Sequence, residues 1–129
     1  MKFIVSEIQQ NDKNTMVCGI TEAGVIKGVW KGREPPVMLN AYHVELSCKE
    51  FNVRKSDKTI GEAYAEVLPS EECVHFCGVC EGIDEDVYFV RFAADWLDMV
   101  DIPEGCNEVK KGDYVSFEVK YNDIWIYVY

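Results

Sequence analysis

The chain has 129 residues, of which 48% are hydrophobic and 28% charged, an ordinary balance for one globular domain with its own core. Its formal net charge is −10, which repels nucleic acid and anionic membranes and attracts basic surfaces. No apolar run reaches the length that spans a bilayer, and the amino-terminal segment lacks the longer apolar core of a secretory signal. These properties predict a single soluble domain over 1–129, located in the cytoplasm.

Period-two alternation of apolar and polar residues dominates the chain and predicts a mainly β fold. In chain order, the predicted strands are 2–8, 15–21, 25–31, 42–48, 73–81, 87–93, 115–121 and 124–129. Clusters of Gly, Asn, Asp and Pro predict turns at 10–14, 22–24, 34–36, 82–86 and 103–107. Strands at this regular spacing favour a single small barrel or a strongly curved antiparallel sheet.

One segment breaks the alternation. Thr59 and Glu62 have the spacing of a capping box, and Pro69 ends the segment. Apolar residues between them fall at helical spacing, namely Ile60, Ala63, Tyr64, Val67 and Leu68. This pattern predicts one short helix at 60–68.

The last predicted strand, 124–129, is apolar on both faces and is therefore expected to be central or covered on both sides. At least one of Trp125 and Tyr127 is then expected to be deeply buried. The short Asn122-Asp123 link predicts a hairpin with the preceding strand.

A weak internal similarity relates two segments, Val17-Cys18-Gly19-Ile20 and Phe76-Cys77-Gly78-Val79. Two interpretations stay open. The chain contains a duplicated and diverged half, or short β-hairpins simply share such patterns.

Three of the six cysteines form Cys73-x3-Cys77-x2-Cys80, a spacing that radical S-adenosylmethionine enzymes use for an iron–sulfur cluster. Alternation along the predicted strand places Cys80 on the face opposite Cys73, His75 and Cys77, so a cluster is not expected. Without a secretory signal, the cysteines are expected to be reduced thiols.

A zinc site on Cys73, His75 and Cys77 is disfavoured, because neighbours on one strand face stand about 6.5–7 Å apart. It also needs a fourth ligand, from Cys106 or His43. We therefore expect no metal and no cofactor. A small Cys/His-dependent or metal-binding enzyme that uses this face is the alternative.

The negative charge is concentrated in one segment. Between Glu62 and Glu108, 13 carboxylates accompany a single Arg, Arg91, whereas residues 1–61 carry a balance of +2. The candidate partner-binding residues in this segment are Asp84, Glu85, Asp86, Asp95, Trp96, Asp98, Met99 and Asp101. They are either a solvated acidic face or an interface in which acids speed association with a basic partner and an apolar anchor such as Trp96 supplies affinity.

A small barrel with aromatic residues also suggests an OB-like or SH3-like module of a larger complex. Nucleic-acid sites of this kind combine aromatic residues with a basic groove. The basic clusters here are short and the whole chain is acidic. Nucleic acid is therefore not expected as a partner.

The chain carries four short motifs followed by an aromatic last strand, namely Gly28-Val29-Trp30-Lys31-Gly32, Pro35-Pro36, Tyr42-x-Val44-Glu45-Leu46 and Val109-x-x-Gly112-Asp113-Tyr114-Val115. They resemble motifs of small β-rich bacterial proteins, some of which are similar to immunity proteins encoded beside polymorphic or contact-dependent inhibition toxins. The resemblance implies a small, acidic, cytoplasmic protein that covers the active site of a basic toxin, often a nuclease. It assigns no binding residue. Our leading hypothesis is a non-enzymatic inhibitor of this kind.

Overall fold

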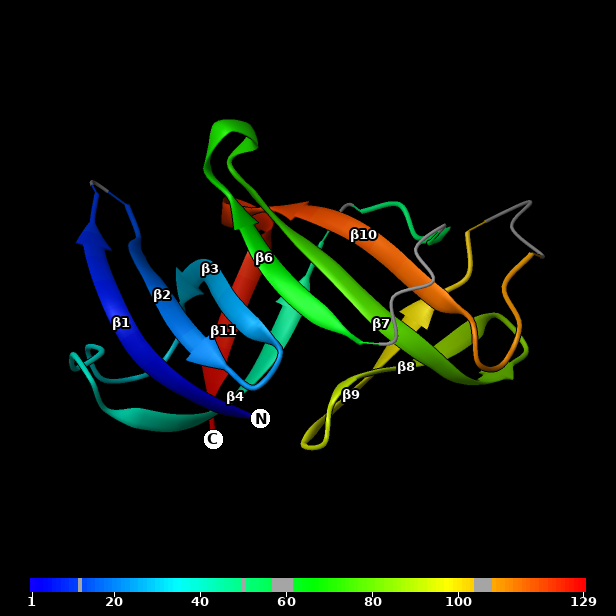
Figure 1. The fold of residues 1–129 in the computed structure, drawn as a ribbon. Coiled ribbons are helices and arrows are strands. Elements are labelled where there is room, and N and C mark those ends of the chain that lie inside the picture. Colours follow the sequence, from blue (N-terminus) through cyan, green and yellow to red (C-terminus); the bar gives the residue numbers. More distant parts are fainter. Residues whose placement is uncertain (12, 50, 57–61, 104–107) are drawn as a thin grey trace.

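Strands make up most of the chain (Figure 1). The structure is a computed structural model that describes residues 1–11, 13–49, 51–56, 62–103 and 108–129. Its strands form a closed five-stranded barrel continued by a second, curved sheet. The predicted mainly β fold with a small barrel is confirmed.

The barrel contains β1 (Lys2–Gln10), β2 (Thr15–Thr21), β3 (Gly24–Trp30), β4 (Ala41–Cys48) and β11 (Ile124–Val128). Neighbouring strands pair in the order β1-β2-β3-β11-β4 and back to β1. All these pairs are antiparallel except β3–β11, which is parallel. Fully buried side chains fill the interior, among them Phe3, Val17, Ile26 and Ile126.

The second sheet contains β5 (Arg54–Lys55), β6 (Tyr64–Leu68), β7 (Cys73–Asp84), β8 (Val87–Ala93), β9 (Trp96–Asp101) and β10 (Tyr114–Lys120). The first half of the long strand β7 lies between β6 and β10, and its second half pairs with the β8–β9 hairpin. A parallel bridge between Gly24 and Ala65 joins the sheet to the barrel. Its core is aromatic, with Phe76, Phe92, Trp96 and Phe117 in mutual ring contact.

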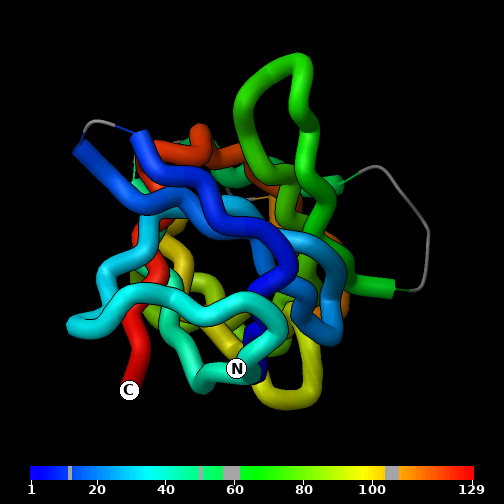
Figure 2. The backbone as a smooth tube through the Cα atoms, turned by 90° about the vertical axis from the view of Figure 1, so that its left-hand side faces the viewer, coloured from blue at the N-terminus to red at the C-terminus, as the bar shows by residue number. Residues whose placement is uncertain are grey.

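Both described ends of the chain lie beside β4. The Met1 ammonium donates to the carbonyl oxygen of Val44 at 3.0 Å, and the Tyr129 N–H donates to that of His43 at 3.2 Å. In Figure 2, which turns the molecule by 90°, both ends lie on the same side of the barrel.

Several predicted elements are confirmed. Strands 15–21 and 87–93 match β2 and β8, and the other predicted strands agree with observed ones to within one to three residues at each end. Two observed strands, β5 and β6, lie where no strand is predicted. The strand β9 lies in the acidic stretch, to which the sequence assigned neither a strand nor a helix. The predicted turn at 103–107 lies mostly outside the described residues.

The predicted helix at 60–68 is wrong over its described part. Residues Tyr64–Leu68 form β6, which pairs with β7 along its whole length, and Pro69 begins the short 3-10 helix η1 (Pro69–Glu71). Ala65 is buried, and its N–H donates to the carbonyl oxygen of Ala23 at 2.9 Å. Pairing with two neighbours therefore overrides the helical spacing of the apolar residues. Residues 59–61 lie outside the described part.

The last strand is central, as predicted, since β11 has neighbours on both sides. The predicted hairpin with β10 is wrong, because the 3-10 helix η2 (Tyr121–Asp123) redirects the chain into the barrel. The predicted burial of Trp125 or Tyr127 is also wrong. Ile124 and Ile126 fill the interior, whereas Trp125 is half-buried on the outer surface and Tyr127 is 40% exposed.

The two similar segments lie on β2 and β7, where Gly19 and Gly78 each leave room for aromatic side chains. A Cβ at Gly19 would lie 2.1 Å from the Phe3 ring, and one at Gly78 would lie 2.9 Å from the Phe92 ring. The pairings around the two strands differ, because β2 lies between β1 and β3 while β7 has three neighbours. The shared pattern thus reflects similar packing on a central strand rather than one repeated set of pairings.

Candidate functional site

The main candidate surface is the outer side of β7, β8 and β9. Pairing across these strands aligns three rows, Asp84–Val87–Asp101, Gly82–Phe89–Met99 and Val79–Arg91–Leu97. The alternate residues of β8 and β9, such as Val90 and Val100, are buried on the inner side. We call the nine aligned residues, with the turn residues Glu85 and Asp86, the acidic hairpin face.

Apart from Asp101, the part of this face that β9 contributes is apolar and open to solvent. Met99 is 69% exposed and Leu97 is 45% exposed, beside the half-buried Phe89. Large exposed apolar side chains that lie together on a sheet are a typical sign of an interaction surface. The sequence hypothesis included Met99 but missed Leu97.

Carboxylates lie at one end of this face, around the β7–β8 turn and the paired residue Asp101. Asp84, Glu85 and Asp86 form the tight β7–β8 turn, in which Glu85 adopts a left-handed backbone conformation with φ of 50°. The one cation of the face, Arg91, is already paired with Glu81 at 3.1 Å. The face therefore carries a net negative charge at its turn end, next to the exposed apolar residues.

Three of the predicted site residues lie elsewhere. Trp96 is only 6% exposed and stacks on Phe92 with ring centroids 4.5 Å apart, so it is a core residue and not an exposed anchor as predicted. Its indole N–H donates to the Asp98 carboxylate at 3.1 Å, also on the inner side. Asp95, in the β8–β9 turn, accepts a hydrogen bond from the Lys2 backbone N–H at 2.8 Å, which ties the hairpin to the barrel.

Asp98 occupies a narrow gap between the hairpin and β4. It lines two small hollows together with Leu46, one of about 90 Å³ and one of about 220 Å³. Desolvation raises the pKa of its carboxyl group above the ordinary value, although the hydrogen bond from Trp96 opposes the shift. Asp98 therefore faces the interior of the molecule rather than a partner.

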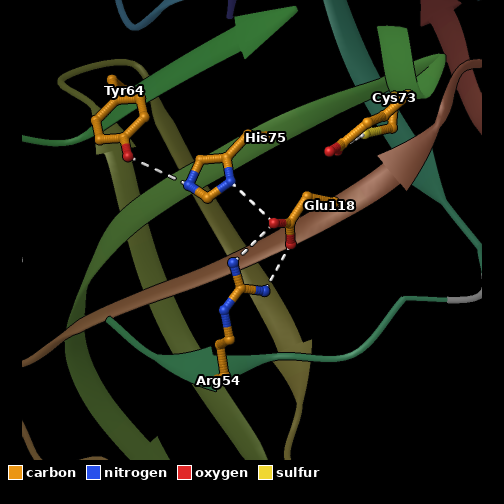
Figure 3. A network of polar contacts seen from close by, with 6 residues as sticks. Arg54, Tyr64, Cys73, His75 and Glu118 are labelled. Atoms are coloured by element: carbon orange, nitrogen blue, oxygen red, sulfur yellow. Dashed lines mark hydrogen bonds and ion pairs between the residues drawn. The ribbon is translucent and has the colours of Figure 1, made fainter. Parts of the chain in front are cut away.

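The second candidate, the Cys73/His75/Cys77 face, contains a polar ladder that crosses four neighbouring strands (Figure 3). The His75 ring lies between the Tyr64 hydroxyl, 3.2 Å from Nε2, and the Glu118 carboxylate, 3.2 Å from Nδ1. Arg54 donates two hydrogen bonds to Glu118, at 2.6 and 2.7 Å. The hydrogen bond from Arg54 lowers the pKa of the Glu118 carboxyl group, and His75 adds to the shift.

The contacts of this ladder hold neighbouring strands together and therefore have a structural role. Its members come from β6, β7, β10 and β5, and the bidentate Arg54–Glu118 pair secures the two-residue edge strand β5. Cys73 and Cys77 flank His75 and are buried, and burial raises the pKa of the Cys73 thiol. A protonated buried thiol is a poor nucleophile and a poor metal ligand.

Among the residues that the structure describes, no group of three or more His, Cys, Asp and Glu side chains is placed to hold a metal ion. Cys106, one proposed fourth ligand, lies outside those residues. The five described cysteines are free thiols. Burial raises the pKa of Cys18 to about 11 and that of Cys48 to about 12.

No helix in the described part of the chain is long and apolar enough to cross a membrane. No protein-family model, curated protein or solved structure matches the chain.

Proposed function

We propose that the protein is a non-enzymatic binding protein whose acidic hairpin face covers a basic surface of a partner protein. One observation carries the proposal: Leu97 and Met99 are exposed on β9, in a face that carries four carboxylates at one end and whose single Arg is neutralised. An apolar centre supplies affinity by losing contact with water, and a charged rim accelerates encounter and selects partners of opposite charge.

The more specific proposal is an immunity or inhibitor protein that neutralises a basic toxin, such as a nuclease, in the cytoplasm. Its support is the resemblance of four sequence motifs and the net charge of −10. Nucleases bind polyanions, so their active sites are basic and accept an acidic cover.

Rescue from toxicity tests this proposal. The product of the neighbouring gene is expressed in a bacterial host with and without this protein, because an immunity gene normally accompanies its toxin gene. We expect toxicity without this protein and growth with it. Met99→Lys is expected to abolish rescue, because it places a cation at the centre of the contact. Met38→Lys, the same change at a site that is 48% exposed on the barrel, is expected to retain it.

Binding kinetics at two salt concentrations separate the rim from the centre. The double variant Asp84→Asn, Asp86→Asn is expected to slow association and to weaken its salt dependence, while Met99→Lys mainly speeds dissociation. The matched control is Glu22→Gln, Glu66→Gln, which removes two exposed charges elsewhere. Tighter binding in high salt, or binding indifferent to all these changes, contradicts the proposal.

A second candidate, a ligand-binding module of the OB class, is favoured by the connectivity of the barrel. The order β1-β2-β3-β11-β4 with a parallel β3–β11 pair is that of the five-stranded OB barrel, with β5 to β10 inserted before the last strand. Such barrels bind ligands on the second and third strands and the loops beside them. A hollow of about 460 Å³ lies there, lined by residues that include Asn11, Lys27, Glu72 and Tyr121.

The lining favours a neutral oligosaccharide over nucleic acid. The positive charges of its two Lys residues are balanced by the negative charges of Glu72 and Asp123, and its other polar side chains include neutral amides. Lys27 Nζ lies 4.7 Å from the centre of the Tyr121 ring, so the Lys27 ammonium group occupies one face of that ring. A glycan array tests this candidate. Binding of an oligosaccharide that is lost in Tyr121→Ala supports it, and an array without a positive spot contradicts it.

A further inference from the structure

A surface hollow with an apolar floor lies on the barrel, lined mostly by residues from the first third of the sequence, which carries a slight excess of positive charge. It has a volume of about 610 Å³, and residues that line it include Trp30, Lys31, Arg33, Val37, Tyr42 and Tyr127. They come from the end of β3, the loop 31–40, the start of β4 and the end of β11. Three aromatic residues line the hollow beside aliphatic and charged ones. A volume of this size with apolar side chains and a few polar groups is typical of small-molecule sites.

The aromatic floor of the hollow is fixed. Trp30 is 8% exposed and belongs to the barrel core, and its indole N–H donates to the Glu34 carbonyl oxygen at 2.8 Å. Tyr42 meets Trp30 edge to face at 5.0 Å, and its hydroxyl accepts a hydrogen bond from the Val37 N–H at 3.0 Å. Both rings therefore hold the loop 31–40, so the hollow exists before a ligand arrives.

The backbone of the loop 31–40 is strained at Leu39. Leu39 has a φ of 67°, a conformation that a bulky residue rarely adopts, and its side chain is 75% exposed. Its backbone N–H donates to the Val5 carbonyl oxygen at 2.8 Å, which holds it in this conformation. Leu39 does not itself line the hollow, but Val37 and Asn40 beside it do. Strain of this kind persists where the surroundings fix it and is concentrated near functional sites.

The charged residues that line the hollow are Lys31, Arg33 and Glu34, and their net charge of +1 favours a negatively charged ligand. Lys31 and Arg33 are exposed, and neither has a carboxylate within ion-pair distance in the described part of the chain. Lys31 Nζ lies 4.3 Å from the centre of the Trp125 ring, whose own centre is 6.5 Å from that of Tyr127, one of the rings that line the hollow. Arg33 is free to form a two-pronged hydrogen bond with a carboxylate or phosphate group.

We propose that this hollow binds a small planar aromatic anion, with the ring against Trp30, Tyr42 and Tyr127 and the anionic group on Lys31 and Arg33. The site is separate from the acidic hairpin face and does not depend on the function proposed above. A carboxylate and a phosphate share the required chemistry.

The test is titration of the intact protein with para-hydroxyphenylacetate and, in a second arm, with adenosine monophosphate. The uncharged control for the carboxylate is para-hydroxyphenylethanol, and that for the phosphate is adenosine. In a two-dimensional amide spectrum, the indole N–H signal of Trp30 is expected to shift on binding, whereas that of the distant core residue Trp96 is not. Binding in one arm alone identifies the anionic group that the site prefers.

Two exposed substitutions assign the binding to this hollow. Arg33→Glu is expected to weaken affinity by about tenfold or more, as loss of a charge-assisted pair does, and Tyr127→Ala is expected to weaken it through the lost ring contact. Lys13→Glu, the matched charge change on the exposed β1–β2 loop, is expected to leave affinity unchanged. The proposal is overturned if neither anion binds, if the uncharged compounds bind equally well, or if binding is unchanged in both variants.

Discussion

Two tryptophan substitutions test whether the core has been placed correctly. Trp96 is 6% exposed and packs on Phe92 at 4.5 Å and edge-on to Phe76 at 6.0 Å. Replacement of a buried Trp by Ala typically costs about 3–5 kcal/mol, from lost burial and the cavity left behind. We expect Trp96→Ala to reduce the free energy of unfolding by that amount.

Trp125 provides the comparison, because the sequence predicted that it or Tyr127 would be deeply buried. It is half-buried on the outer surface of β11, where Lys31 and Lys49 lie 4.3 and 3.4 Å from its ring centre. Trp125→Ala removes these cation–π contacts and some partly covered apolar area, which together contribute about 1–2 kcal/mol. The two substitutions are therefore expected to differ by about 1 kcal/mol or more in their effect on stability.

Urea unfolding followed by circular dichroism measures both effects, and thermal unfolding gives an independent value. For a domain of this size, Trp96→Ala is expected to lower the melting temperature by about 10–20 °C. Trp96→Phe is the control that keeps a ring in place and is expected to recover part of the loss. Equal destabilisation by Trp96→Ala and Trp125→Ala would refute this placement of the core, and so would a stable Trp96→Ala.

Three further predictions concern charge, thiols and metal. Glu118→Gln is expected to lower the urea midpoint at neutral pH and Asp98→Asn to raise it, because the folded pKa is lowered for Glu118 and raised for Asp98. The difference in urea midpoint between each variant and the wild type is expected to shrink on acidification, as the carboxylate becomes protonated in the folded protein. A midpoint that moves in the opposite direction in either variant contradicts the direction given for that pKa. Cys18 and Cys48, with pKa values raised to about 11 and about 12, are expected to react with iodoacetamide slowly in the native protein and rapidly in urea, measured by peptide mass spectrometry. Elemental analysis is expected to find far less than one zinc or iron per chain, and a full equivalent that disappears in Cys77→Ser would restore the metal-enzyme alternative.

The sequence predicted most strands because alternation is a local signal. It failed at β6, where the apolar residues satisfy helical spacing, and pairing with β7 decides the outcome. It gave no clear prediction for β9, because the inward position between Trp96 and Val100 is occupied by Asp98, which disguises the period of two. Local patterns also carry no information on which distant strands pair, so the route of β11 into the barrel was missed.

The candidate site was predicted in part. Charge counting located the acidic segment, and Asp84, Met99 and Asp101 do lie on one outward face. The side of the strand was wrong for Trp96 and Asp98, since the register that orients β9 depends on its pairing with β8. The hollow of the barrel was not predicted, because its residues come from two distant segments, 30–42 and 127–128, that meet only on barrel closure.

The insertion of the second sheet between β4 and β11 sets the order of events during synthesis. Four barrel strands leave the ribosome early, but the seam between β3 and β4 stays open until everything from Lys49 to Asp123 has followed. Such distant pairing makes for slow folding, and unpaired strand edges invite association between nascent chains. Circular permutation that joins the two chain ends beside β4 and opens the chain between β10 and β11 would place β11 directly before β1. All five barrel strands would then be contiguous, and we expect the rearranged chain to refold faster than the natural one.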